Sequence, residues 1–294
     1  MFRRTLLAGL PAAAVVRAAR FSKPLGLSLY TVRGPLAKDP AKTYRDIAAA
    51  GIVELEVRPD NLHHHASMIA DAGLRPVHMF IDSSVITGGW DEWRTFMSAN
   101  AARLKMAPPA DAPKPSLAEM LELASKHKVR RIGLSYLLPG ERKVAVERIN
   151  AAIPQCAAAG IELYYHNHAF EFGGKPGERM IDTLLAELDP RVRLELDVFW
   201  ATVGGEDPAA LIRRAKGRVA SLHLKDAAPG VKPGATEFAV PPSAFKEVGA
   251  GTIDWFTVLK AANEARVDHY LIEQDHTPGD PIDSIRKSIH FLRS

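Results

Sequence analysis

The chain has 294 residues, of which 47% are hydrophobic and 24% are charged. This composition excludes a disordered or low-complexity chain and allows one large core, and the length is typical of a single α/β barrel. The net charge of +4 comes from 38 basic and 34 acidic residues, but four of the arginines lie in the first 20 residues, so the rest of the chain carries no net charge. A neutral body gives no support for nucleic-acid binding.

The first 20 residues differ in composition from the rest of the chain. Arg3 and Arg4 precede a short apolar run from Leu6 to Val16, and small residues follow that run. This order is typical of a secretory signal peptide, and the paired arginines resemble a twin-arginine signal. We therefore expect residues 1–20 to be a signal peptide and the protein to be exported to the periplasm; the alternative is a cytoplasmic protein with a basic apolar extension. The run is too short to span a bilayer and no later run is long enough, so we expect no stable membrane association.

Short apolar runs rich in strand-forming residues alternate with amphipathic helical stretches along residues 21–294. Strands alternating with helices predict parallel pairing with helical crossovers, and eight such units predict one closed (β/α)₈ TIM barrel as a single domain. No GxGxxG or GxxxxGK[ST] motif follows the first run, so we expect no nucleotide cofactor. The eight runs are 25–30, 53–57, 75–81, 130–136, 161–166, 191–197, 219–225 and 269–274.

Polar side chains gather at the ends of the last four runs. Active sites of α/β barrels collect at the carboxyl ends of the strands, so these side chains are expected to meet at one mouth. Two or three carboxylates with an imidazole suit a divalent metal such as Mn²⁺, Co²⁺, Fe²⁺ or Zn²⁺. Each residue alone could be a capping or ion-pairing residue, but four neighbouring strand ends favour a metal site. The residues are His166, His168 and Glu171; Asp197; His223, Lys225 and Asp226; and Glu273 and Asp275.

The motifs YHNHAFEF, LELDVFW, LHLKD, VGAGTIDW and LIEQD resemble the xylose-isomerase-like barrel superfamily of sugar isomerases and epimerases. Within it, the chain is most similar to the branch that holds inosose dehydratases, ketose 3-epimerases and hydroxypyruvate isomerases. The resemblance runs from about residue 25 to the end, and its motifs are specific in the second half and weak in the first.

This resemblance implies that Glu171, Asp197, His223 and Glu273 hold one divalent metal ion. Mn²⁺ is the first choice, with Co²⁺, Fe²⁺, Zn²⁺ or Mg²⁺ as alternatives. In some relatives the first glutamate lies inside the strand, where this chain has Tyr164 to His166. His166 or His168 is therefore the alternative to Glu171 as a ligand.

The resemblance also implies a reaction on a keto-sugar or inosose. A metal that polarises a carbonyl and a neighbouring hydroxyl acidifies the C–H bond between them. Glu171 and Glu273 would act as the catalytic bases on opposite sides of the substrate. Return of the proton to the other face gives epimerisation, return to the neighbouring carbon gives isomerisation, and loss of a β-oxygen gives dehydration or lyase chemistry. The sequence does not choose among the three.

Five further residues are predicted to bind the small carbohydrate or polyol substrate. His168 and Lys225 would contact hydroxyls or the enolate oxygen, although Lys225 could instead pair with Asp226. Trp200 would stack on a sugar ring or pack in the core, and a histidine inside a strand can also be a core residue. The five are Tyr30, His78, His168, Trp200 and Lys225, and Arg33 is expected to line the pocket beside Tyr30.

Two other functions are alternatives to the enzyme. A nucleic-acid repair endonuclease of the same superfamily needs a histidine three residues after the Asp197 position, where this chain has Trp200. Together with the neutral body, this difference argues against a nucleic-acid partner. An exported sugar-binding barrel without catalysis is the remaining alternative, and a homo-oligomer is compatible with the sequence.

Overall fold

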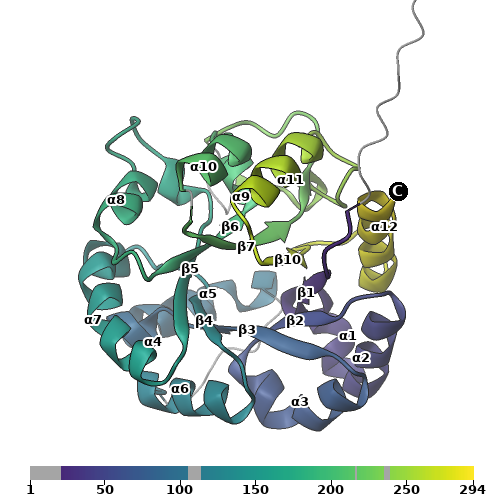
Figure 1. The fold of residues 1–294 in the computed structure, drawn as a ribbon, viewed down its shortest axis with the longest axis horizontal. Coiled ribbons are helices and arrows are strands. Elements are labelled where there is room, and N and C mark those ends of the chain that lie inside the picture. The colour runs from purple at the N-terminus through teal and green to yellow at the C-terminus, as the bar shows by residue number, and fades with distance from the viewer. Residues whose placement is uncertain (1–20, 105–113, 216, 235–238) are drawn as a thin grey trace, which may run out of the picture.

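The computed structural model describes residues 21–104, 114–215, 217–234 and 239–294, and the expected signal peptide lies outside these ranges. Eight parallel strands close into a barrel in the order β1-β10-β7-β6-β5-β4-β3-β2, with helices around it (Figure 1), which confirms the predicted TIM barrel. Each predicted run contains one strand. The strands are β1 (Gly26–Ser28), β2 (Glu54–Val57), β3 (Arg75–Ile81), β4 (Arg131–Leu134), β5 (Glu162–His166), β6 (Arg193–Asp197), β7 (Val219–Leu224) and β10 (His269–Ile272).

The helices begin with ordinary local signals. Ser116 and Glu119 form a capping box at the start of α6, and Asp207 and Asp280 cap helices that have proline in the first turn. The main helices are α1 (Arg33–Lys38), α2 (Pro40–Ala49), α3 (Pro59–Asp71), α4 (Ser84–Thr87), α5 (Trp90–Leu104), α6 (Leu117–Lys126), α7 (Ala145–Ala158), α8 (Met180–Glu187), α9 (Val198–Val203), α10 (Pro208–Arg214), α11 (Trp255–Glu264) and α12 (Pro281–Arg293).

The two faces of the barrel strands differ in chemistry. Side chains alternate along a strand, so Leu163 and Tyr165 of β5 pack in the core between barrel and helices, whereas Tyr164 and His166 face the barrel axis. The axial positions of several strands carry charged or polar residues that are fully or almost fully buried. Barrel interiors are usually filled by branched apolar side chains. The buried axial charges therefore mark this interior as unusual, because burying a charge is costly unless it is paired.

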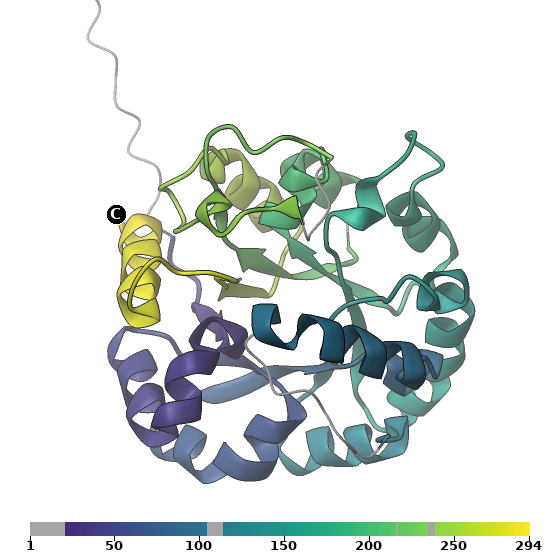
Figure 2. The same cartoon turned by 180° about the vertical axis from the view of Figure 1, so that it is seen from behind.

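Two helices, α4 and α5, follow β3 before the outer helix α6. Connections from strand to helix run over the carboxyl end of the barrel, so these two helices belong to its mouth. Figure 2 shows α5 crossing the open end of the barrel. This helix is therefore placed to wall the site and not to cover the outside of the sheet.

A buried carboxylate organises the rim after β7, where β8 (Asp226–Ala227) pairs with β9 (Phe245–Lys246). Asp226 Oδ1 accepts hydrogen bonds from the backbone N–H groups of Ala227 and Ile253, and its Oδ2 accepts from Gly249 N, Gly251 N and Trp255 Nε1, at 2.7 to 3.1 Å. A Cβ at Gly251 would lie 2.3 Å from Ala227 O, which explains the glycine. The LHLKD and VGAGTIDW motifs are thus joined by Asp226 in a structural role.

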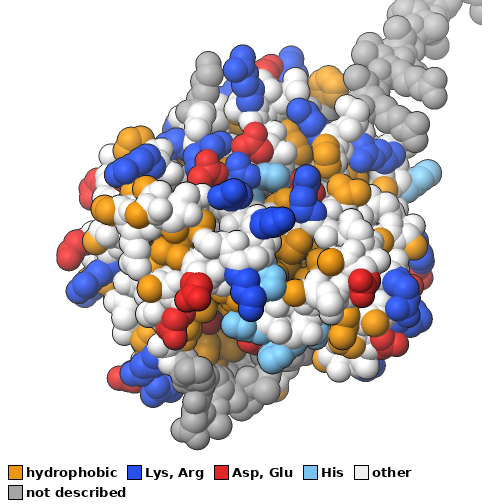
Figure 3. Space-filling model, turned by 60° about the horizontal axis from the view of Figure 1, so that its bottom comes forward, with side chains coloured by type: hydrophobic (Ala, Val, Ile, Leu, Met, Phe, Trp, Pro, Cys, Tyr) orange, Lys and Arg blue, Asp and Glu red, His pale blue; other side chains and the backbone are white. Residues whose placement is uncertain are grey.

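The charges on the surface are mixed, in keeping with the zero net charge expected for the chain after its first 20 residues. On the face in Figure 3, Lys and Arg side chains are interspersed with Asp, Glu and hydrophobic side chains. Among the described residues, no helix is both long enough and apolar enough to cross a bilayer.

Candidate active site

A cavity of about 560 Å³ opens at the carboxyl ends of the strands. Its volume lies in the range of roughly 300–1,000 Å³ that is usual for small-molecule sites. Its inner end is lined by polar side chains and its outer part by aromatic ones. The inner lining includes Glu56, His166, Glu273 and Asp275; the outer lining includes Tyr30, Trp93, Phe96, Tyr136, Trp200 and Phe245.

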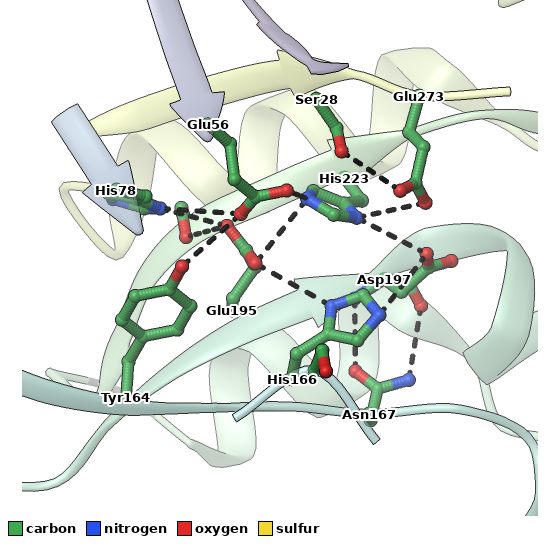
Figure 4. A network of polar contacts seen from close by, with 12 residues as sticks. Ser28, Glu56, His78, Tyr164, His166, Asn167, Glu195, Asp197, His223 and Glu273 are labelled. Atoms are coloured by element: carbon green, nitrogen blue, oxygen red, sulfur yellow. Dashed lines mark hydrogen bonds and ion pairs between the residues drawn. The ribbon is translucent and has the colours of Figure 1, made fainter. Parts of the chain in front are cut away.

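Side chains with metal-binding atoms from four neighbouring strand ends lie beside this inner end (Figure 4). Asp197 Oδ2 lies 4.0 Å from His166 Nε2 and 3.6 Å from His223 Nδ1, and His223 Nδ1 lies 3.1 Å from Glu273 Oε2. Ligands at about 2.1 Å from a tetrahedral ion are about 3.4 Å apart, which is close to these three separations. Asp197 nevertheless belongs to none of the groups of described residues whose ligand atoms all lie within 4.8 Å of one another. Asp197 Oδ2 forms an ion pair with Lys225 at 2.8 Å but is buried without a hydrogen bond among the described residues. The chemistry of this set, two imidazoles and two carboxylates, therefore suits a divalent metal ion.

A second set of charged residues lies along the barrel axis next to these donors. Glu195 lies two residues before Asp197 and faces the same side of β6; its Oε1 accepts from Ser221 Oγ at 2.7 Å and lies 3.0 Å from His78 Nδ1. Glu56 of β2 lies 3.0 Å from His223 Nε2. Three groups here have ligand atoms within 4.8 Å of one another: His166, Glu195 and His223; Glu56, His78 and Glu195; and Glu56, His223 and Glu273.

Glu56 and Glu195 are functional candidates that the sequence analysis missed. Both occupy axial positions in short strands, Glu56 in ELEV and Glu195 in LELD. The signal was present, because a charged residue inside an otherwise buried strand needs a partner. The alternation of side chains along a strand could have revealed Glu195, since it lies on the same face of its strand as Asp197.

The charges in this cluster depend on one another. Burial and the charge of Glu56 raise the pKa of Glu195 to about 7, whereas His223 lowers the pKa of Glu56 to about 2 against the effect of burial. Burial would lower the pKa of His223, but Glu195, Glu273 and Glu56 raise it well above its ordinary value. The described structure therefore holds an imidazolium between carboxylates, and a metal ion would have to replace that proton.

Lys225 is fully buried among the carboxylates of the site. Its Nζ lies 2.5 Å from Glu273 Oε2, 2.7 Å from Asp275 Oδ2 and 2.8 Å from Asp197 Oδ2. Burial would lower the pKa of Lys225, but Asp197, Asp275 and Glu273 raise it well above its ordinary value. The lysine therefore remains charged and pairs with these three residues, and not with Asp226.

The structure does not bring Glu171 to the other predicted ligands. Its Oε1 accepts from Tyr165 Oη at 2.6 Å and its Oε2 from His168 N at 2.9 Å. Tyr165 faces the outer core, so Glu171 lies behind the barrel wall, and among the described residues it belongs to no group able to share an ion. The geometry therefore does not support Glu171 as a ligand and base. His166, the alternative, faces the barrel axis where Glu171 was expected.

The predicted substrate-binding residues divide into two sets. Tyr30, His168 and Trp200 line the cavity. Burial, followed by the positive charge of Lys225, lowers the pKa of His168 to about 3, so its imidazole is neutral. His78 and Lys225 are fully buried in the polar cluster, so the structure gives them electrostatic contacts in place of the predicted contact with a cavity ligand.

Known proteins match this chain in sequence and in structure. A family model described as xylose isomerase-like TIM barrel matches residues 116–294. An inosose dehydratase from Lacticaseibacillus casei is 28% identical over 152 residues, which cover 45% of this chain and 47% of that protein. The chain spans about half the length of the curated relatives it matches.

Two solved structures share the fold over nearly the whole chain. A sugar phosphate isomerase/epimerase from Parabacteroides distasonis has a TM-score of 0.64 at 23% identity and covers 97% of this chain and 98% of its own. The IOLI protein with a binding zinc atom has a TM-score of 0.62 at 16% identity and covers 92% of this chain and 98% of its own.

Proposed function

Because the chain belongs to the xylose isomerase-like TIM barrel family, we propose that it is a divalent-metal-dependent enzyme acting on a keto-sugar or inosose. It would move a proton next to the substrate carbonyl, as an isomerase, an epimerase or a dehydratase. One observation carries the proposal: donor atoms of His166, Asp197, His223 and Glu273 lie beside the cavity in a chain of contacts 3.1 to 4.0 Å long. The similarity to inosose dehydratases supports the same chemistry.

Two imidazoles and two carboxylates would hold the metal ion. This mixed nitrogen and oxygen set suits Mn²⁺, and also Co²⁺, Fe²⁺ or Zn²⁺, better than Mg²⁺, which prefers oxygen ligands. When bound, such an ion polarises a carbonyl and stabilises the enediolate that follows proton loss.

Glu273 is the residue we assign as the base. It lines the cavity, and its carboxylate is oriented by Ser28 Oγ on Oε1 at 3.1 Å and by His223 Nδ1 near Oε2 at 3.1 Å. Burial would raise its pKa, but Lys225 and His223 lower that pKa well below its ordinary value. Glu273 is therefore ionised at neutral pH and can accept a proton from a substrate carbon held at the inner end.

Asp275 replaces Glu171 as the second carboxylate of the proposed mechanism. It lines the cavity and shares the Lys225 ammonium with Glu273. The pair can hold or return a proton at the substrate, with Lys225 balancing the negative charge of both carboxylates. The position to which the proton returns then decides between epimerisation and isomerisation, and departure of a β-oxygen gives dehydration.

The test uses the full chain loaded with Mn²⁺ and a panel of ketohexoses, inososes and 3-keto-glycosides in deuterated water. We expect NMR to show exchange of a C–H proton next to the carbonyl of at least one compound, followed by its product. Glu273→Gln keeps the size of the side chain and removes the base, so exchange should fall by at least about a hundredfold. Glu187→Gln, on the exposed end of α8, is the matched control and should exchange at the wild-type rate.

Two results would contradict the proposal. Exchange by Glu273→Gln at the wild-type rate would remove the assigned base. A protein that binds Mn²⁺ and a sugar but exchanges no proton in any compound would favour a sugar-binding barrel without catalysis.

A further inference from the structure

The outer part of the cavity is built differently from its inner end. Figure 4 shows the polar groups of the inner end pointing toward one another across the barrel axis. Beyond them, Trp93, Phe96 and Met97 of α5 line the cavity on one side, and Trp200 lines it at a different strand end. A cavity of about 560 Å³ has room for a sugar at the inner end and a further group beyond it.

Five rings form a continuous wall along this outer part. Phe96 is stacked on Tyr136 with ring centres 5.6 Å apart and an interplanar angle of 19°. Tyr136 then meets His168 edge to face at 4.8 Å, His168 lies 5.7 Å from Trp200, and Trp200 meets Phe245 edge to face at 5.7 Å. All five line the cavity. Aromatic pairs at such distances stabilise one another, so the five packed rings restrict one another's movement.

The cationic side chains of the lining already have partners. Among the described residues, the arginines that line the cavity are Arg33 and Arg58. Arg33 donates to the carbonyls of Tyr30 and Asp275 at 2.7 and 2.9 Å and lies over the Tyr30 ring at 3.9 Å. Arg58 pairs with Asp82 at 2.9 Å. This lining favours a neutral group over a phosphate, which needs cationic side chains directed at it.

We propose that the outer part of the cavity is a subsite for a flat aromatic group, so the substrate class is a keto-sugar that carries an aryl substituent, as in the aryl glycoside of a keto-sugar. The inference rests on the proposed function because it takes the sugar carbonyl to lie at the inner end. Phe96 and Tyr136 supply the flat faces against which the aryl ring packs. A rigid wall ordered before binding loses little conformational freedom when the ligand enters.

The experiment measures binding without turnover, by calorimetry on the full chain loaded with Mn²⁺. The probes are phenyl, cyclohexyl and methyl glycosides of glucose, galactose and xylose. In at least one sugar series, the phenyl glycoside should bind about tenfold more tightly than the methyl glycoside and more tightly than the cyclohexyl one, since a saturated ring cannot stack.

Variants locate the preference in the wall. Phe96→Leu removes one stacked ring and should abolish most of the phenyl-over-methyl ratio, whereas Tyr136→Phe keeps the ring and should retain it. Phe256→Leu is the matched control, because Phe256 is 62% exposed on α11, away from the cavity. This control should bind both probes as the wild type does.

Equal binding of phenyl and methyl glycosides in all three series would overturn the proposal. So would a phenyl-over-methyl affinity ratio in Phe96→Leu equal to that of the wild type, or equal affinities for phenyl and cyclohexyl glycosides. These outcomes are separate from a failure of the proposed function. A protein that prefers phenyl glycosides but exchanges no proton would contradict the proposed reaction and support the aryl subsite. A protein that exchanges protons but shows no phenyl preference would support the reaction and contradict the subsite.

Discussion

The mouth of the barrel has two unlike halves. The helix α5 and the loop after β4 contribute Phe96 and Tyr136 to the aromatic wall, whereas the ends of β5, β6, β7 and β10 contribute the proposed donor atoms and the segments after them contribute the other three rings. An ion requires donors at fixed distances, so few side chains can serve at the late strand ends. A wall for an apolar group requires only shape and flat area. This difference explains why the motifs of the second half were specific and those of the first half were weak.

Each half contains one buried carboxylate that accepts several hydrogen bonds and joins neighbouring loops. Glu141 accepts from Ser84 Oγ at 2.7 Å, Thr87 Oγ1 at 2.5 Å and Leu138 N at 2.9 Å, which joins the loops after β3 and β4. Asp226 has the same role in the late half. Asp197 differs from both, because its Oδ2 faces imidazoles and the Lys225 ammonium and accepts no hydrogen bond from any residue that the structure describes. A buried carboxylate whose oxygens accept several N–H and O–H hydrogen bonds has a structural role. A buried carboxylate that faces other possible metal ligands is a candidate for the functional site.

The largest expected effect is the loss of stability on substitution of Asp226, the buried structural carboxylate of the late half. In Asp226→Asn, the amide N–H₂ would face backbone donors, so at least two charge-assisted hydrogen bonds would be lost and the free energy of unfolding should fall by about 4 kcal/mol. Urea unfolding followed by circular dichroism measures this change. Asp254→Asn is the control, since Asp254 caps exposed Thr257 N and asparagine caps about as well. A loss below about 1 kcal/mol for Asp226→Asn would contradict its structural role.

The second effect separates Asp197 from Asp226. Asp197→Asn keeps the cap on Trp200 N, which Asp197 Oδ1 accepts at 2.8 Å, but removes the anionic Oδ2. Calorimetry should show Mn²⁺ binding weakened by about a hundredfold, equivalent to about 2.7 kcal/mol. Asp207→Asn, which alters only the cap of α10, should bind Mn²⁺ normally. Normal Mn²⁺ affinity in Asp197→Asn would exclude Asp197 as a ligand.

The third effect tests whether the two halves are independent. Glu141→Gln replaces an acceptor of several hydrogen bonds and should cost about 2 kcal/mol in the free energy of unfolding. Because Glu141 anchors the segment before α5, phenyl glycosides should bind more weakly while Mn²⁺ affinity stays unchanged. Thermal unfolding and calorimetry measure the two quantities. Equal weakening of metal and aryl binding would show that the halves are coupled.

The barrel was predictable because every strand is a short apolar run bounded by helical sequence. The positions of Asp197, His223 and Glu273 were predictable, since they lie at strand ends where barrel geometry places them near one another. The position of Glu171 was not, because the chain turns outward after His166 and carries Glu171 behind the wall. The metal-binding role of these residues remains a prediction. Sequence spacing beyond a strand end does not show the direction in which the chain leaves the barrel.

Three of the five rings of the aromatic wall escaped the sequence analysis for another reason. Phe96, Tyr136 and Phe245 come from elements far apart in the chain, and no motif links them. In α5, Trp93, Phe96 and Met97 are spaced as on one helix face, but that face lines the cavity and not the barrel core. Only the three-dimensional structure shows whether such a helix face lines a cavity or packs on the barrel core.

The smallest effect concerns the outer support of the late half, where Asp182 of α8 accepts from Arg179 Nε at 2.9 Å, Gly177 N at 2.7 Å and Arg214 Nη1 at 3.0 Å. The bond from Arg179 is the main reason that the pKa of Asp182 is lowered to about 2. A lowered pKa in the folded state stabilises the protein above pH 4, and this contribution is lost as the pH falls toward 2. Asp182→Asn should therefore cost about 1 kcal/mol at pH 7 after allowance for solvent screening, and about half as much at pH 3. Urea unfolding of wild type and variant at both pH values measures the difference. A cost that did not shrink at pH 3 would show that Asp182 stabilises α8 by hydrogen bonding and not by its charge, and that the outer support of the late half does not depend on ion pairs as its inner site does.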